Sequence, residues 1–144
     1  MKYAHAIFCD DVRHERGGQT SYIGVYQSRV YIHGALPRTT RLHAVVWIVS
    51  TEGEPFERIT LVIEHPNGEI TTHPYPQLPQ PDGNGGDAGP RRLVAQADLT
   101  FDPFHVADES ALGRLAIHAE IDGERVPAGA IDLLHADTPR DGDA

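Results

Sequence analysis

The stretch from Tyr3 to Tyr26 constrains the fold of this chain more than any other. It consists of two runs with the composition of β-strands, YAHAIFCDDVRHE and TSYIGVY, on either side of Gly17-Gly18. Glycine adopts positive φ without steric cost, so a glycine pair between two such runs is typical of a tight turn. We therefore predict an antiparallel hairpin centred on Gly17-Gly18. This register pairs Val12 with Ile23, Asp10 with Val25, and Asp11 with Gly24.

Strand-like alternation continues along the rest of the chain. Segment 42–49 is apolar on both faces, as in a central strand that is covered from both sides, whereas segments 59–63, 93–101 and 115–121 are apolar at every second residue. Asn67-Gly68 and Asp122-Gly123 each predict a two-residue hairpin turn. Asp102-Pro103 is expected to end a strand, and 107–112 suggests one helical turn. The predicted strands after the first hairpin are 29–33, 42–49, 58–65, 70–73, 92–101, 114–121 and 125–134.

These patterns predict an all-β fold. The expected architecture is an antiparallel β-sandwich, immunoglobulin-like or C2-like, with eight or nine strands and at most one or two helical turns. A closed barrel is the architectural alternative. Pro127 and Gly129 interrupt the last strand, which predicts either an edge position or a bulge there.

One domain accounts for the whole chain. Its 144 residues can bury a hydrophobic core without a disulfide or a structural metal. We expect a single β-sandwich domain over residues 1–135 and a flexible C-terminal tail over residues 136–144. Residues 74–90, PYPQLPQPDGNGGDAGP, hold five prolines and four glycines, which predicts one long surface loop inside the domain.

Charge and cysteine content limit the partners and the compartment. The formal net charge is −9 and the twelve Lys and Arg residues are scattered, which argues against binding nucleic acid or an anionic membrane surface. The longest apolar run, Ala44–Val49, is too short to cross a membrane, and the N-terminal residues lack the apolar segment of a signal peptide. Cys9 has no second cysteine to pair with, so we expect a reducing compartment, the cytoplasm.

Two segments resemble known proteins. Residues 7–26, IFCDDVRHERGGQTSYIGVY, resemble the opening of a family of small uncharacterised bacterial proteins, a domain of unknown function, in which a Cys-Asp-Asp strand leads through a Gly-containing turn to an Ile-Gly-Val-Tyr strand. Residues 113–126, GRLAIHAEIDGERV, look like the paired strands of immunoglobulin-like or C2-like sandwiches. The family implies a sandwich fold over roughly the whole chain and supplies no activity.

Asp10 and Asp11 are the first candidate site residues. In the predicted register Asp10 shares an apolar face with Val12 and Val25, where an ionised carboxylate is costly unless it is paired or hydrogen-bonded. Such a carboxylate suits a general acid–base or metal site with a perturbed pKa. It also suits a structural group that accepts backbone N–H bonds, which is the interpretation we favour. Asp11 lies on the face of Arg13, so we expect a partly exposed ion pair between them.

Nine histidines are spread over nearly every strand and loop. None has the i,i+4 spacing of a helical zinc motif, and no Cys-x-x-Cys accompanies them. The Asn67-Gly68 turn pairs His65 with Ile70 and His73 with Val62, so it does not bring these two histidines together. His43 and His118 lie on strands that could meet in space. We expect separate surface or half-buried histidines.

Residues 82–87, Asp-Gly-Asn-Gly-Gly-Asp, superficially resemble a calcium loop. Asp82, Asn84 and Asp87 would supply oxygen ligands, and Asp102 and Asp108 could add carboxylates from another loop, as in C2-type domains. The segment lacks the terminal bidentate Glu of the EF-hand pattern. With Asp10 and Asp11 these are the candidate metal ligands of the chain, and a solvated turn is the simpler interpretation.

No catalytic motif is recognisable. Cys9 lies mid-strand without an electropositive setting, no serine has the context of a nucleophile elbow, and no phosphate-binding glycine loop precedes a helix. We therefore expect no catalytic residue and no cofactor. Residues 76–79, PQLP, have the PxxP form that polyproline-binding modules recognise, but no basic residue flanks them closely.

The leading hypothesis is a non-enzymatic interaction, assembly or accessory protein that acts through loops or sheet edges. A protein partner or self-association is expected, including a homodimer through a sheet edge, with Arg29–His33 or Arg125–Leu134 as candidate edges. The runner-up is a metal-dependent protein that uses Asp and His clusters. A third hypothesis is a hydrolase or lyase with a pocket that contains Asp10 and a histidine within hydrogen-bond reach.

Overall fold

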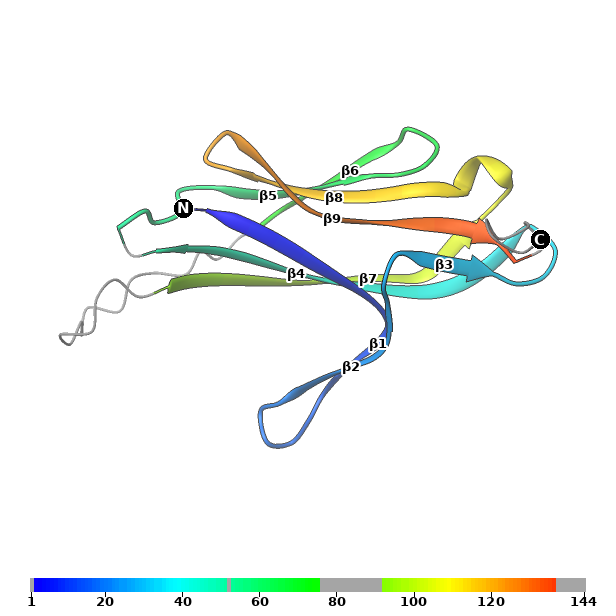
Figure 1. The fold of residues 1–144 in the computed structure, drawn as a ribbon, viewed down its shortest axis with the longest axis horizontal. Coiled ribbons are helices and arrows are strands. Elements are labelled where there is room, and N and C mark those ends of the chain that lie inside the picture. Colours follow the sequence, from blue (N-terminus) through cyan, green and yellow to red (C-terminus); the bar gives the residue numbers. More distant parts are fainter. Residues whose placement is uncertain (1, 52, 76–91, 137–144) are drawn as a thin grey trace.

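Strands that are apolar on one side must bury that side, and here two sheets do so by packing face to face (Figure 1). The computed structural model describes residues 2–51, 53–75 and 92–136. Sheet A has the strand order β2-β1-β4-β7, and sheet B has the order β3-β9-β8-β5-β6. The elements are β1 (Tyr3–His14), β2 (Thr20–Tyr26), β3 (Arg29–Ile32), β4 (Arg38–Thr51), β5 (Ile59–Glu64), β6 (Ile70–Pro74), β7 (Arg92–Val106), η1 (Glu109–Ala111), β8 (Gly113–Ile121) and β9 (Glu124–His135).

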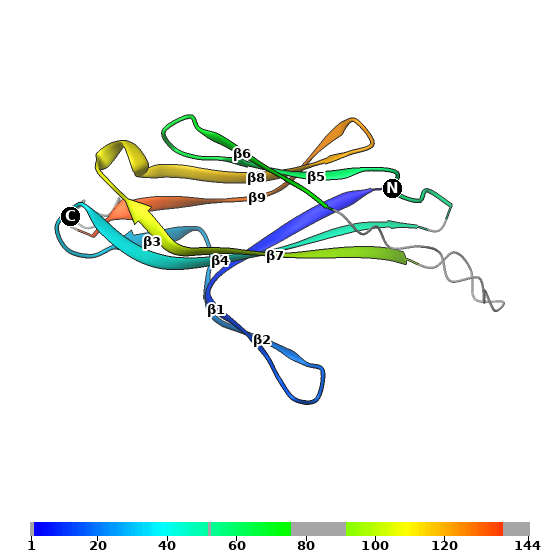
Figure 2. The ribbon, with the colours of Figure 1, turned by 180° about the vertical axis from the view of Figure 1, so that it is seen from behind.

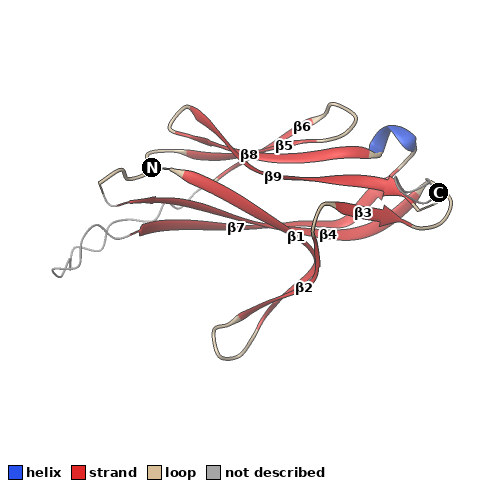
Figure 3. Ribbon diagram, viewed as in Figure 1, coloured by secondary structure: helices blue, strands red, loops and turns tan. Residues whose placement is uncertain are grey.

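The predicted all-β sandwich is confirmed. The described residues form nine strands, and their one helix is the short 3-10 turn η1 (Figure 3). Asp108 is the N-cap of η1. Sheet B is mixed because β3 runs parallel to β9, whereas every other strand pair is antiparallel. An immunoglobulin-like or C2-like connectivity stays a prediction. The described part of the chain has no helix long and apolar enough to cross a membrane.

The predicted alternation places the core between the sheets. In sheet B the inward side chains of β5 and β8 are all buried. In sheet A, β4 is apolar on both faces as predicted, since outward Val45 and Val49 are buried along with the inward residues. The central inward residues are Ala44, Val46 and Ile48 of β4, Ile59, Leu61 and Ile63 of β5, and Leu115, Ile117, Ala119 and Ile121 of β8.

The first hairpin forms, but its predicted register is wrong by one residue. Asp11 lies opposite Ile23 and Cys9 opposite Val25. The loop has three residues and not two, because the N–H of Gly18 bonds to the carbonyl of Glu15 at 3.2 Å and the N–H of Glu15 bonds to Gln19 at 2.7 Å. This is a type I turn followed by a glycine in the left-handed region, with φ of 79° at Gly18.

The hairpin between β5 and β6 differs from its prediction in the same way. The N–H of Gly68 bonds to the carbonyl of His65, and Gly68 has φ of 89°. Glu64 therefore lies opposite Ile70, and His73 lies opposite Leu61. The two-residue turn at Asp122-Gly123 is confirmed: both residues have positive φ, and Ile121 pairs with Glu124.

β7 does not end at Asp102-Pro103 as predicted but continues to Val106. β4 begins at Arg38, four residues earlier than the predicted start at Leu42, and so offers a pairing partner for the extension. Thr40 pairs with Phe104 and Leu42 with Phe101, so residues 102 and 103 form a bulge opposite residue 41. A proline is tolerated in a bulge because no ladder hydrogen bond is needed there.

The hairpin of β1 and β2 leaves the sandwich, as Figures 1 and 2 show. β1 pairs with β4 from Tyr3 to Cys9 and then continues with β2 alone. We call residues 10–24 the arm. Gly24 lies at its base with φ of 65°. In the view of Figure 1 the arm turns back beneath the outer face of sheet A.

Candidate functional site

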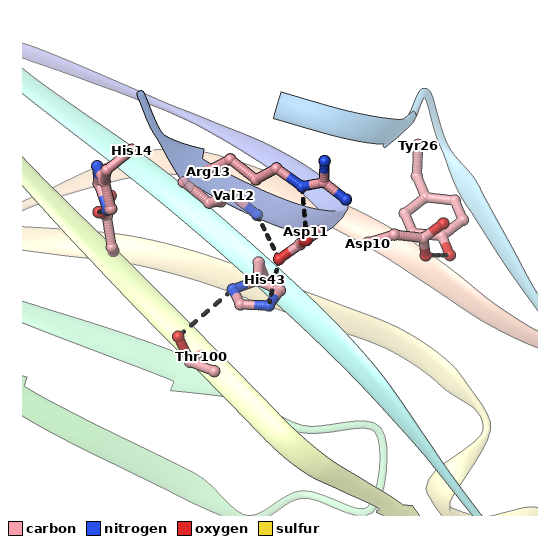
Figure 4. A network of polar contacts seen from close by, with 9 residues as sticks. Asp10, Asp11, Val12, Arg13, His14, Tyr26, His43 and Thr100 are labelled. Atoms are coloured by element: carbon pink, nitrogen blue, oxygen red, sulfur yellow. Dashed lines mark hydrogen bonds and ion pairs between the residues drawn. The ribbon is translucent and has the colours of Figure 1, made fainter. Parts of the chain in front are cut away.

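Asp10 occupies the base of the arm in an exposed position and not on the predicted apolar face. The hydroxyl of Tyr26 donates a hydrogen bond to its Oδ1 (Figure 4). A Cβ atom on Gly24 would lie 2.5 Å from Oδ2 of Asp10, so a side chain at position 24 would displace the carboxylate from this position. Burial, then the hydrogen bond to Asp10, raises the pKa of Tyr26 to about 12. The Asp10 carboxylate is thus a structural acceptor for a tyrosine that stays protonated.

Asp11 forms the expected ion pair with Arg13, with Oδ2 3.4 Å from Nε. Its Oδ1 accepts the N–H of Val12 at 3.0 Å and lies 3.9 Å from Nε2 of His43. Partial burial would raise the pKa of the Asp11 carboxyl, but the hydrogen bond from Arg13 and the charge of Arg41 hold it below its ordinary value. Asp11 is therefore ionised and lies beside an imidazole.

Thr100, His43 and Asp11 follow one another in the order hydroxyl, imidazole, carboxylate, the order of a hydrolase triad (Figure 4). Oγ1 of Thr100 lies 3.4 Å from Nδ1 of His43, and Nε2 of His43 lies 3.9 Å from Asp11. Proton transfer needs about 2.6–3.2 Å. Nε2 of His43 is buried and has no hydrogen-bond partner among the described residues. These contacts can orient an imidazole, but they offer no short proton path.

Cys9 lies opposite His43 in the β1–β4 ladder, but it is not an activated nucleophile. Its side chain is fully buried. Burial, and then the charge of Asp10, raises the pKa of the Cys9 thiol. A thiol is nucleophilic as the thiolate, so a raised pKa makes this one inert near neutral pH.

The arm rests against the outer face of sheet A. The ring of Tyr22 packs edge-on against Trp47 of β4, with centroids 5.6 Å apart. Closer to the tip of the arm, Nε2 of His14 lies 3.7 Å from Oδ2 of Asp98 in β7. The arm thereby helps to cover the second apolar face of β4, which explains how a strand at the surface layer can be apolar on both sides.

His43 and His118, whose strands could have met in space, lie in different sheets. His43 belongs to sheet A and contacts Thr100, whereas His118 belongs to sheet B and lies 3.9 Å from Glu64. His65 bonds to Thr71 at 3.0 Å within its own hairpin. Eight of the nine are exposed or half-buried as expected, and His118 is the exception, with 6% of its surface exposed.

The candidate metal ligands do not converge in the described part of the chain, where no three His, Cys, Asp or Glu side chains could hold an ion. Asp108 instead caps η1, since its Oδ1 accepts the N–H of Ser110 at 2.8 Å. Asp102 contributes backbone to the β7 bulge. Asp82, Asn84 and Asp87, like the PxxP motif at 76–79, lie outside the described residues.

A hollow that the site predictions missed lies on the outer face of sheet B. It has a volume of about 360 Å³, and none of Asp10, Asp11 and His43 lines it. We call it the sheet B hollow. The sequence contained one signal for it: Pro127 and Gly129 predicted either an edge position or a bulge. β9 is bulged there, since Ile117 pairs with Gly129 but His118 with Pro127. Its lining residues are Glu64, Arg114, Ala116, Ile117, His118, Arg125, Pro127, Gly129 and Ala130.

Comparisons with protein-family models, curated proteins and solved structures found no match to this chain. The resemblance of residues 7–26 to a bacterial family stays a prediction.

Proposed function

We propose that this protein is a non-enzymatic interaction protein that binds an extended segment of a partner protein along the outer edge of β7. The observation that carries the proposal is the open side of this strand. β7 is 15 residues long, and among the described residues it pairs with β4 on one side only. An edge strand presents a row of unpaired backbone N–H and C=O groups, which can pair with a strand from another chain.

One hydrogen bond identifies the residues that face this open side. The hydroxyl of Tyr75 donates to the carbonyl of Gln96 at 2.8 Å. Backbone groups alternate in an antiparallel ladder, so Val94 and Asp98 direct their N–H and C=O groups to the same side as Gln96. Val94 also leaves 47% of its surface exposed at this edge. A partner strand laid here would bond to the outward backbone groups of Val94 and Asp98, contact the side chain of Val94, and displace the Tyr75 hydroxyl from the Gln96 carbonyl.

The candidate edges of sheet B support the proposal less well. Arg29–Ile32 is an edge strand, as the sequence suggested, but it has only four residues. β9 pairs with β3 only from Asp132 onward, so the candidate edge Arg125–Leu134 is covered on both sides at its end, whereas residues 125–131 pair, among the described residues, with β8 alone. That uncovered part is bulged and contains Pro127, which has no N–H to donate. β6 has five residues and ends at Pro74, which has no N–H to donate.

Charge favours a partner protein over a second copy of this chain. Each copy carries a formal net charge of −9, so two copies repel one another. Asp98 stands in the middle of the open edge, where a Lys or Arg of the incoming strand would pair with it. We infer that the partner segment is extended and basic. The reducing cytoplasm is the compartment we propose, because Cys9 is a free, buried thiol.

Site-specific photo-cross-linking in cells of the source organism tests the proposal. A photoreactive side chain at Val94 should give one discrete adduct that maps to an extended segment of another protein. The same group at Ile70, on the edge of β6 and 65% exposed, is the matched control and should give none. Gln96→Pro removes an outward N–H and should abolish the adduct.

Three outcomes would contradict the proposal. Equal adducts at Val94 and Ile70 would indicate non-specific capture. An adduct of twice the chain's mass would identify a second copy as the occupant. The absence of any adduct at Val94 would leave the edge without a partner. No observation on the described residues favours the metal-dependent alternative or the hydrolase hypothesis over this one.

A further inference from the structure

The sheet B hollow lies on a different sheet from the β7 edge, on the side of sheet B that faces away from sheet A. Figures 1 and 2 show the β5–β6 and β8–β9 hairpins curling outward on this side. The lining residues come from β5, β8 and β9. The hollow is thus independent of the proposed strand-binding edge.

Small side chains make the floor of the hollow. Ala116 pairs with Ala130 across β8 and β9, and Gly129 follows directly. The bulge at residue 128 then shifts the register, so that Pro127 and not residue 128 lies opposite His118. Bulges bend a strand and re-aim its side chains, and they are frequent beside functional sites. Here a bulge and three small residues produce an apolar floor between longer polar side chains.

Cationic side chains outnumber anionic ones around this floor. Nη2 of Arg125 lies 2.9 Å from Oε1 of Glu64, and Nδ1 of His118 lies 3.9 Å from the same oxygen. Arg114 also lines the hollow, and its cross-strand neighbour is Asp132. Within the described part of the chain, the Arg114 side chain makes no hydrogen bond and no ion pair. The hollow therefore holds two guanidinium groups and one carboxylate, in a protein whose formal net charge is −9.

We propose that the sheet B hollow binds a small molecule that carries an oxyanion, a carboxylate or a phosphate, between Arg114 and Arg125. Guanidinium groups recognise these anions with charge-assisted, often bidentate hydrogen bonds. The volume of about 360 Å³ suits a small ligand, whose short carbon skeleton would rest on Ala116 and Ala130. His118, with 8% of its side chain exposed, lies at the wall of this site.

Glu64 sets the affinity of this site by competition. Its carboxylate already occupies Arg125, so an incoming anion must share or displace that partner. Glu64→Gln keeps the shape of the side chain and removes the charge. Anion binding should therefore become tighter in Glu64→Gln and weaker in Arg114→Gln or Arg125→Gln. A change of charge elsewhere on the surface should produce neither effect.

Amide chemical shifts of the folded protein provide the test, with inorganic phosphate and succinate as separate probes. At constant ionic strength, at least one probe should bind saturably, with a Kd of the order of 1 mM, and shift the amides of Arg114, Ala116 and His118. Arg114→Gln and Arg125→Gln should each weaken binding about tenfold, the loss expected for one charged hydrogen bond. Glu64→Gln should tighten it several-fold.

Arg13→Gln is the matched control, because Arg13 is 65% exposed and Arg125 is 63% exposed, and both pair with a carboxylate. It should leave the affinity unchanged. Binding to phosphate alone or to succinate alone would decide the class of anion. The proposal is overturned if neither probe saturates, if Arg13→Gln weakens binding as much as Arg114→Gln, or if Glu64→Gln fails to tighten it.

Discussion

Nζ of Lys2 lies 2.6 Å from Oδ2 of Asp122, across a separation of 120 residues in the chain. The other carboxylate oxygen of Asp122 accepts the backbone N–H groups of Glu57 at 2.8 Å and Arg58 at 2.7 Å. One carboxylate in the β8–β9 turn thus holds the start of β1 and the segment that leads into β5. Because β1 belongs to sheet A and β5 to sheet B, this group ties the two layers together at one end of the sandwich.

Asp122→Asn should remove the ion pair with Lys2 and keep the two hydrogen bonds from the backbone of Glu57 and Arg58. Asparagine tolerates the positive φ of 52° at this position, and its carbonyl oxygen can still accept both backbone N–H groups. Only the contact with Lys2 is lost, so we expect a loss of about 0.5–1 kcal/mol in the free energy of unfolding by urea. Lys2→Met should cost a similar amount. A double variant as unstable as the sum of the two would contradict coupling between these residues.

The same pair makes stability depend on pH in a defined window. The hydrogen bond from Lys2 lowers the pKa of Asp122 below its ordinary 3.8, and the hydrogen bond to Asp122 raises the pKa of Lys2 above its ordinary 10.5. The lowered pKa of Asp122 contributes stability above pH 3.8, and this stability is lost as the pH falls through the shifted value. The raised pKa of Lys2 contributes stability below pH 10.5, and this stability is lost as the pH rises through the shifted value. The stability gap between the natural protein and Asp122→Asn should therefore be widest near neutral pH and shrink at both extremes.

Turn residues predicted which strands pair but not always how they align. Asp122-Gly123 forms the expected two-residue turn because both residues adopt positive φ, whereas in the other two glycine turns only the second residue does. Pro66 indicates the three-residue loop of the β5–β6 hairpin, because its fixed φ suits the first central position of a type I turn. Three-residue hairpin loops contain such a turn. One residue of slip changes every cross-strand neighbour in the hairpin. Asp10 is exposed for a separate reason, because β1 pairs with β4 only as far as Cys9 and the next residues belong to the arm.

Gly24→Ala tests the fit between Asp10 and the base of the arm. The new Cβ would lie 2.5 Å from Oδ2 of Asp10, at a backbone φ of 65°. Strain and clash together should lower the free energy of unfolding by about 2 kcal/mol or more. Gly18→Ala is the control, since φ is 79° there and nothing lies within 4 Å of the new Cβ. It should cost only the backbone strain, about 1 kcal/mol. Equal losses in the two variants would argue against the Asp10 clash.

The candidate sites were harder to predict than the fold for a physical reason. Whether a strand buries one face follows from its own residues, but the sheet B hollow depends on three strands and on the register that a bulge creates. Arg114, Ala116 and His118 alternate along β8, and this pattern predicts only that they share a face. Their proximity to Glu64 and Arg125 results from pairing with β5 and β9, which no local pattern encodes.

Tyr26 should ionise at an unusually high pH for a tyrosine. Burial and the hydrogen bond to Asp10 raise its pKa to about 12, so its absorbance change should fall well above that of an ordinary phenol. The raised pKa of Tyr26 contributes stability to the fold below the ordinary pKa of 10, and this contribution is lost as the pH rises through the shifted pKa. The free energy of unfolding should therefore decline between about pH 10 and 12. In Asp10→Asn the Tyr26 titration should move toward lower pH without reaching the ordinary value, because burial persists. An unchanged titration would rule out the contribution of Asp10.

Gly129 should be the position in β9 least tolerant of a larger side chain. A Cβ there would lie 3.3 Å from Cβ of Ala6 in β1 and 3.7 Å from the ring of Phe8, at the place where the two sheets approach one another. Gly129→Val should therefore destabilise the protein by about 1–3 kcal/mol through overpacking, and Gly129→Ala by less. Ala6→Gly combined with Gly129→Ala should recover most of the loss, measured by urea unfolding. If the double variant were no more stable than Gly129→Ala alone, the contact with Ala6 would not be the cause.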